Sequence, residues 1–117
     1  MIEEIEEQLG SIVPDCIIAS VGGGGLMLGL IEGCIRNGWM NKNIKLIAVE
    51  THGADCFSES VKQNRLVTLD AITSIAKTLG AKTCSSKLFE YYNLYKDKIE
   101  SIVLSGINTL KFKYITI

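Results

Sequence analysis

Four consecutive glycines at positions 22–25 limit the possible fold of this chain more than any other feature of its sequence. The run before them, CIIASV at residues 16–21, has the length and composition of a parallel strand that is buried on both faces. The residues after them predict a helix ending near Asn37 and Gly38, because apolar side chains recur at the spacing of one helix face: Met27, Leu30, Ile31 and Cys34. The glycines therefore join a buried strand to a helix.

The rest of the chain continues this alternation of strands and helices. Residues 45–50 (KLIAVE) predict a second buried strand, which gives a parallel strand, helix, strand unit with a right-handed crossover. Gly29 and Gly33, four residues apart, would let their helix lie close to a neighbouring element. The sequence thus predicts one α/β domain over residues 1–117, with a mostly parallel sheet and flanking helices. Its other expected elements are helices at residues 2–9 (closed by Gly10), 54–64 and 87–95 (capped by Ser85 and Ser86), a strand at 99–105, and a loop with a short helix near 73–79.

Composition excludes several classes of partner. Charged residues make up 21% of the 117 residues and the formal net charge is -1, so no basic field is available to hold nucleic acid or an anionic membrane surface. The first ten residues are acidic where a secretory signal would be basic and then apolar. No apolar stretch reaches the roughly 18 residues needed to cross a bilayer. We therefore expect a cytoplasmic protein with no nucleic-acid and no membrane partner.

The four cysteines are expected to be reduced thiols. Cys16, Cys34, Cys56 and Cys84 are unevenly spaced and form no CxxC pair, so their spacing does not indicate a zinc site. Disulfide scaffolds are usually shorter and richer in cysteine. Cys16 and Cys34 fall within apolar runs, where a free thiol behaves as a small core residue.

The junction of a strand with a helix presents unpaired N–H groups at the positive end of the helix dipole, which suits an anion such as phosphate. Glycines allow positive φ, and without Cβ atoms several N–H groups can converge on one phosphate. Each glycine costs about 0.5 to 1 kcal/mol of folding free energy relative to alanine, so four in succession indicate a ligand. The structural alternative is a tight turn between strand and helix.

The motifs that surround the glycines decide which phosphate is expected. A P-loop needs GxxxxGK[ST], but Leu30 follows Gly29, so the lysine and the magnesium-binding hydroxyl are both missing. The dinucleotide pattern GxGxxG fails in every frame, because Leu26, Met27 or Leu28 occupies a glycine position. A cofactor with a single phosphate and no pyrophosphate fits better than a nucleotide.

Three motifs in this order, SVGGGGL, VETHGADCF and ITSIAKTLGAKT, resemble the L-serine dehydratase and threonine deaminase group of pyridoxal-phosphate enzymes. The similarity extends from about residue 12 to residue 105. The resemblance implies an open, twisted sheet in three layers, as part of the larger domain of a fold-type II enzyme similar to the tryptophan synthase β subunit. It also implies that the phosphate of pyridoxal phosphate is bound by the tetraglycine loop and the next N–H group: Gly22, Gly23, Gly24, Gly25 and Leu26.

The same family carries a monovalent, potassium-like cation near its cofactor, bound largely by backbone carbonyls. A lone carboxylate with several carbonyls suits a hard ion of single charge. From the residues alone, Glu50 is better explained as a solvated charge at a strand end or as a group that caps a helix. Carried over by position, the resemblance implicates the carbonyls of Gly22, Ala54, Leu79 and Ala81, the carboxylate of Glu50, and Cys56.

The resemblance implies an L-serine/L-threonine ammonia-lyase that converts its amino-acid substrate to pyruvate or 2-oxobutanoate plus ammonia, as a homodimer. Lys77 in SIAKTLG invites assignment as the Schiff-base lysine, but the family's covalent lysine lies upstream of this region, and Lys77 corresponds to a structural lysine. His52, the single histidine, could touch substrate, although an ordinary loop histidine is the simpler interpretation. No catalytic residue is assigned to this chain.

Two departures from the family affect the expected activity. The portion that carries the Schiff-base lysine and the substrate-carboxylate loop is missing, and the divergent tail GINTLKFKYITI at 106–117 does not match. We therefore expect a fragment, a partial domain that is inactive alone and binds the cofactor weakly. The alternative is a noncatalytic regulatory or interaction domain derived from that family, which would associate through exposed sheet edges and apolar surface.

Overall fold

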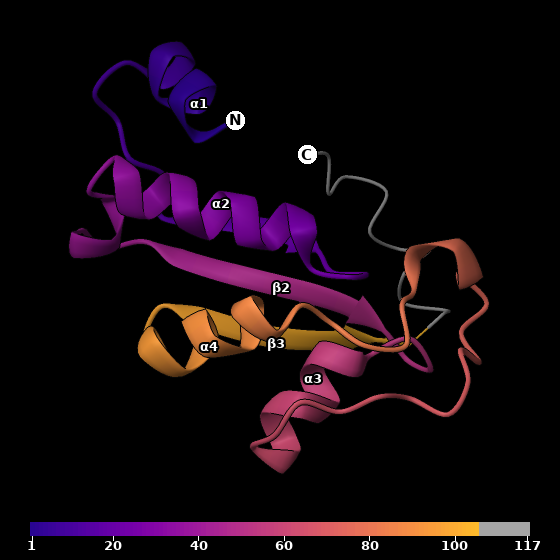
Figure 1. Ribbon diagram of the computed structural model, residues 1–117. Coiled ribbons are helices and arrows are strands. Elements are labelled where there is room, and N and C mark those ends of the chain that lie inside the picture. Colours follow the sequence, from indigo (N-terminus) through magenta and orange to yellow (C-terminus); the bar gives the residue numbers. More distant parts are fainter. Residues whose placement is uncertain (106–117) are drawn as a thin grey trace.

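A computed structural model describes residues 1–105 of the chain (Figure 1). The expected α/β fold is confirmed, and the divergent tail lies outside the described residues. The helices are α1 (Ile2–Leu9), α2 (Gly25–Arg36), α3 (Cys56–Gln63) and α4 (Ser86–Leu94), with short 3-10 helices η1 (Trp39–Asn41) and η2 (Lys77–Leu79). The strands are β1 (Cys16–Ser20), β2 (Lys45–Thr51) and β3 (Ile99–Leu104).

The three strands form one parallel sheet in the order β1-β2-β3. Ala19 of β1 pairs with Ala48 of β2, which pairs in turn with Ser101 of β3. The predicted strand, helix, strand unit is therefore confirmed as β1, α2 and β2. Because the strands are parallel, the loops after β1 and β2 meet at the same edge of the sheet, where the tetraglycine loop lies.

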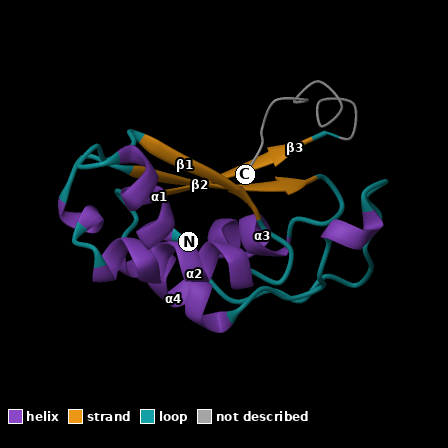
Figure 2. Ribbon diagram, turned by 90° about the horizontal axis from the view of Figure 1, so that it is seen from above, coloured by secondary structure: helices purple, strands orange, loops and turns teal. Residues whose placement is uncertain are grey.

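The helices lie on one side of the sheet, as Figure 2 shows. Along β2 the side chains alternate, with Leu46 and Ala48 buried and Ile47 and Val49 only half-buried. The prediction that residues 16–21 are buried on both faces is wrong for the described part of the chain. There β1 is an edge strand, and Ala19 is the one buried residue within it. Of the three layers expected, residues 1–105 supply the sheet and one layer of helices.

The core lies between the sheet and the helices that cover it. Its largest fully buried side chains include Trp39, Phe57 and Leu88. The predicted apolar face of α2 is confirmed, since four of its side chains belong to this core: Met27, Leu30, Ile31 and Cys34.

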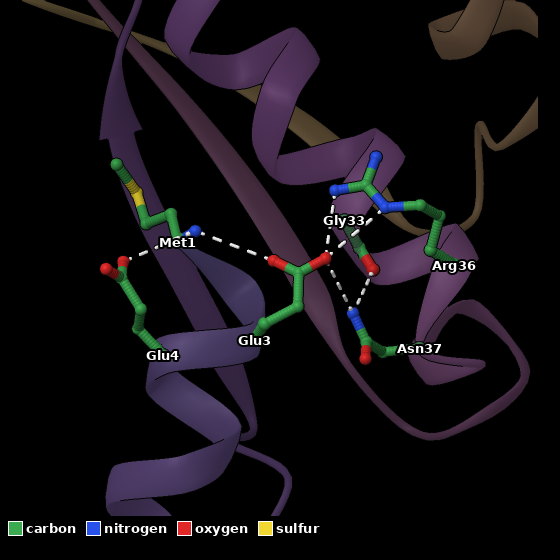
Figure 3. Close-up of polar contacts among 6 residues, drawn as sticks. All are labelled: Met1, Glu3, Glu4, Gly33, Arg36 and Asn37. Atoms are coloured by element: carbon green, nitrogen blue, oxygen red, sulfur yellow. Dashed lines mark hydrogen bonds and ion pairs between the residues drawn. The ribbon is translucent and has the colours of Figure 1, made fainter.

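Gly33 lets α1 approach α2, because a Cβ there would lie 2.6 Å from Ile2 Cγ1. Gly29, predicted to serve the same purpose, has open space around it, so that half of the prediction is wrong. Glu3 of α1 also holds the end of α2 by accepting hydrogen bonds from Arg36 at 3.0 Å and from Asn37 at 3.4 Å (Figure 3). These contacts orient α1 over the carboxyl-terminal half of α2.

The other predicted elements agree with the structure except at their ends. The helix expected from residue 54 begins at Cys56, and Ser85 caps α4 without a side-chain hydrogen bond. The segment 65–84 contains one 3-10 turn, η2, in place of the short helix expected near 73–79.

Candidate functional site

The tetraglycine loop leads from the end of β1 to the start of α2. Val21 extends the sheet by one more hydrogen bond, donating its N–H to the Val49 carbonyl at 2.9 Å. Gly24 then has a φ of 96°, in the left-handed region that favours glycine, and α2 begins at Gly25. The predicted junction of strand, glycine turn and helix is confirmed as a local structure.

The four glycines are of two kinds, which alternate along the loop. A Cβ at Gly22 would overlap the Leu79 carbonyl oxygen, and one at Gly24 would lie 2.8 Å from Leu88 Cδ2. The fold itself therefore requires these two glycines. A Cβ at Gly23 or Gly25 would have no neighbouring atom within 4 Å, and neither residue has a positive φ. A tight turn explains the first pair and leaves Gly23 and Gly25 without a structural reason.

The backbone N–H groups of residues 22–27 have no acceptor among residues 1–105. The first hydrogen bond of α2 runs from the Leu28 N–H to the Gly24 carbonyl at 2.9 Å, so the preceding donors stay free. The first turn of α2 carries no acidic side chain to offset the helix dipole. These free N–H groups can donate hydrogen bonds to an anion, and the open space at Gly23 and Gly25 gives the anion access to them.

The segment that precedes α4 forms one wall of the loop. Ser85 donates its N–H to the Gly23 carbonyl at 2.8 Å, and Leu79 lies against Gly22. The same segment is tied to β2 by a buried hydrogen bond between the Thr51 and Ser74 hydroxyls at 2.7 Å. The segment 65–84 is thus held to the sheet and shapes the glycine loop.

Glu50 is a buried carboxylate near this loop. Its side-chain oxygens accept the N–H groups of Phe57 at 2.9 Å and Ser58 at 2.7 Å, at the start of α3. Glu50 is 2% exposed, and no cationic side chain pairs with it among the described residues. Burial raises the pKa of Glu50 to about 7, against the lowering effect of the two N–H donors. The capping role considered from the sequence is real, and the carboxylate still lacks a counterion.

The structure brings most of the predicted cation-binding residues to one place. Cys56 Sγ lies 3.7 Å from the Gly22 carbonyl oxygen and 3.9 Å from a Glu50 carboxylate oxygen. A Cβ at Gly80 would lie 2.8 Å from the Ala54 side chain, which places Ala54 beside the backbone between Leu79 and Ala81. These residues surround one face of the glycine loop. Among residues 1–105 there is no group of three or more histidine, cysteine or acidic side chains that could hold a metal ion.

Interaction with the Cys84 thiol, together with burial, raises the pKa of Cys56 far above its usual range, and interaction with the Cys56 thiol lowers the pKa of Cys84. All four cysteines are free thiols, as expected. The expectation that Cys16 lies in the core is wrong, because it stands on the exposed side of an edge strand, whereas Cys34 is buried.

Lys77 and His52 are both exposed side chains in loop or 3-10 backbone. Lys77 therefore lacks the desolvated surroundings that make a lysine nucleophilic. Sequence reasoning missed the hydrogen bond between the Thr51 and Ser74 hydroxyls. No local pattern could have found it, because it joins segments that are far apart in the sequence.

The family model described as "Pyridoxal-phosphate dependent enzyme" matches residues 1–107. The chain belongs to this family. It is 41% identical over 105 residues to the L-serine dehydratase/L-threonine deaminase of Rattus norvegicus, which covers 90% of this chain and 28% of the rat protein. It is 41% identical over 115 residues to the L-serine dehydratase of Saccharomyces cerevisiae strain AWRI1631, covering 94% of this chain and 33% of the yeast protein.

A fungal L-serine ammonia-lyase from Rhizomucor miehei has a similar structure, with a TM-score of 0.82 and 36% identity. The match covers 90% of this chain and 32% of the fungal one. The chain spans about a quarter to a third of the length of the relatives it matches. Among its described residues no helix is long and apolar enough to cross a membrane.

Proposed function

We propose that this chain is the phosphate-binding part of the larger domain of a pyridoxal-phosphate dependent L-serine/L-threonine ammonia-lyase. The observation that carries the proposal is the run of free N–H groups at residues 22–27, with open space at Gly23 and Gly25. Because the family is named for pyridoxal phosphate, we expect the phosphate of that cofactor to be the anion that these N–H groups bind. The names of the rat, yeast and fungal relatives support L-serine and L-threonine as substrates of the intact enzyme.

The residues present fit the phosphate of this cofactor. The N–H groups from Gly22 to Leu26 would bind its oxygens, and the positive end of α2 would stabilise its negative charge. When bound, pyridoxal phosphate supplies an electron sink for the carbon chemistry of an amino acid. The contribution of this chain is to hold one end of the cofactor and to orient it. In the proposed intact enzyme, a homodimer in the cytoplasm, the reacting groups come from outside this chain.

A titration with pyridoxal phosphate, followed by its absorbance or by quenching of Trp39 fluorescence, tests the proposal. Gly23→Ala adds a methyl group to the open space without a clash in the protein, so it should weaken binding at least tenfold. Gly29→Ala, also in open space but within α2, is the matched control and should bind like the wild type. Equal affinity of all three proteins would contradict the proposal.

The isolated chain should release no measurable pyruvate from serine, even with the cofactor added. Weak cofactor binding is expected as well, because a site open on one side buries little of its ligand. Pyruvate release by the purified 117-residue chain would contradict the proposal that the reacting groups come from outside it.

We also propose a potassium-like cation at the group formed by Gly22, Glu50, Ala54, Cys56, Leu79 and Ala81. The buried carboxylate without a counterion supports it, and neutral carbonyls around a single carboxylate favour a monovalent ion. Potassium should therefore raise the melting temperature above that in the same concentration of choline chloride. The increase should be absent in Glu50→Gln, and an equal increase in both proteins would refute a site at Glu50.

A noncatalytic interaction domain is the second candidate function. The face of the sheet that the helices leave open carries apolar side chains, such as Ile47, Val49 and Ile102, and Ile102 is 39% exposed. Coexpression with the remaining part of a relative separates the two candidates. An ammonia-lyase part should restore the absorbance band of enzyme-bound pyridoxal phosphate, whereas an interaction domain should associate without it.

A further inference from the structure

The peptide unit between Gly23 and Gly24 is held in one orientation by Ser85. The Ser85 N–H donates to the Gly23 carbonyl at 2.8 Å, and the peptide bond that follows Gly23 is trans. In a planar trans peptide unit the carbonyl and the next N–H point in opposite directions. The Gly24 N–H therefore points away from Ser85, and it is one of the free donors of the glycine loop.

The next peptide unit is oriented by the helix that it opens. The Gly24 carbonyl accepts the Leu28 N–H at 2.9 Å, so the Gly25 N–H points away from the body of α2. That hydrogen bond belongs to the helix and forms with it. The Gly23 carbonyl precedes the helix and is bound by a residue of another element. The direction of the Gly24 N–H thus depends on a tertiary contact.

Ser85 is a well-held donor because the helix that follows it is packed on both the glycine loop and α2. Leu88, in the first turn of α4, is fully buried, and a Cβ at Gly24 would lie 2.8 Å from its Cδ2 atom. Lys87, in the same turn, forms an ion pair with Glu32 of α2 at 3.0 Å. The donor therefore stands at the end of an anchored helix.

Without this hydrogen bond the peptide unit between the two glycines would have more freedom to rotate. Neither glycine has a Cβ that limits its backbone, so several orientations of the unit become accessible. An anion would then have to order the unit on binding, and the entropy lost would weaken its affinity by about tenfold.

We propose that Ser85 is a positioning residue of the anion site, and that its backbone N–H directs the Gly24 N–H toward the bound phosphate. The Ser85 hydroxyl caps α4 with no hydrogen bond, so the backbone group carries this role. Ser85 acts through the Gly23 carbonyl and not by touching the ligand. The inference rests on the proposed function, because it concerns how the same loop holds the phosphate of its cofactor.

Three changes at one position separate the N–H from the hydroxyl. Ser85→Pro removes the donor at a φ of -56°, which proline adopts, and its ring would fill the place of the N–H, so that the Gly23 carbonyl has to turn away. A backbone ester at Ser85, in which an oxygen replaces the N–H, removes the donor without adding an atom. Ser85→Ala keeps the N–H and loses the hydroxyl, which makes it the matched control.

The measurement is a titration of the 117-residue chain, with its glycines isotope-labelled for NMR, with inorganic phosphate and separately with pyridoxal phosphate. Inorganic phosphate cannot react with lysine side chains, so it reports on the N–H groups alone. The wild type and Ser85→Ala should bind both ligands alike and show the same shift of the Gly24 amide resonance. The proline and ester variants should bind about tenfold more weakly and show a smaller shift.

A variant destabilised elsewhere separates positioning from general loss of stability. Gly33→Ala introduces a Cβ 2.6 Å from Ile2 Cγ1, in the contact between α1 and α2. It should be less stable than the wild type and still bind phosphate with unchanged affinity. An equal loss of affinity in Gly33→Ala and in the ester variant would refute the positioning role.

The remaining outcomes distinguish this inference from the proposed function. If the wild type binds phosphate and the ester variant binds it equally well, Ser85 does not position the loop, although the loop is an anion site. If Ser85→Ala loses as much affinity as the ester variant, the hydroxyl is responsible and the inference is wrong. If the wild type binds neither ligand, the proposed function fails and the inference fails with it. The ester variant decides the matter if Ser85→Pro does not fold.

Discussion

Gly22 and Gly23 are neighbours with opposite surroundings, and alanine substitutions at the two positions should therefore have opposite effects. In Gly22→Ala, the new methyl group would overlap the backbone carbonyl of Leu79, and a backbone atom cannot move aside as a flexible side chain can. Such overpacking costs about 1 to 3 kcal/mol. In Gly23→Ala the methyl group enters open space at a residue without positive φ, so the lower entropy of the unfolded chain stabilises the protein by about 0.4 to 1 kcal/mol.

The expected difference in the free energy of unfolding between the two variants is about 1.4 to 4 kcal/mol, with Gly22→Ala the less stable. For a domain of this size, the middle of that range corresponds to roughly 10 °C in melting temperature. Urea unfolding followed by circular dichroism measures this difference. Equal slopes of unfolding free energy against urea concentration would show that the two variants expose the same surface on unfolding. Equal stability of the two variants would refute the contact between Gly22 and Leu79. Gly23→Ala should nevertheless be the variant that binds pyridoxal phosphate poorly, so stability and binding should change in opposite directions.

Two further predictions concern the helix contact and the buried carboxylate. Gly33→Ala should destabilise the protein by about 1 to 2 kcal/mol, because its Cβ would lie 2.6 Å from Ile2 Cγ1. Gly29→Ala, a helix substitution in open space, should instead stabilise it by about 0.5 to 1 kcal/mol. Thermal unfolding compares the two variants, and a gain in stability for Gly33→Ala would contradict the packing of α1 on α2. Because burial raises the pKa of Glu50 from 4.5 to about 7, its contribution to stability is complete below pH 4.5 and is lost as the pH rises through 7. Urea unfolding across this range in a potassium-free buffer should show the decline in the wild type and a smaller one in Glu50→Gln, and parallel curves would exclude Glu50 as its source.

The order and type of the elements could be predicted because they depend on local patterns. The stripe of Met27, Leu30 and Ile31 indicates a helix wherever that segment lies in a fold, and the glycine run marks the junction before it. The unbroken apolar run at residues 16–21 indicated a strand correctly but not its burial. An apolar side chain shows that a position can be buried, but the element that buries it comes from elsewhere in the chain.

The candidate site shows the same division. The sequence predicted a loop suited to phosphate and indicated, through three motifs, the family that the comparison confirms. It did not distinguish the glycines at 22 and 24, which pack against Leu79 and Leu88, from those at 23 and 25, which face open space. The sequence also did not predict that the Ser85 N–H donates to the Gly23 carbonyl, a contact between distant segments.

The sequence by itself determined that a strand, a glycine turn and a helix follow one another, because backbone conformation responds to residues only a few positions away. The tertiary structure alone decided which glycines are needed for packing, which face of the sheet is covered, and that Cys56 lies beside the Gly22 carbonyl. These contacts join residues far apart along the chain, and their geometry exists only once the helices have packed on the sheet.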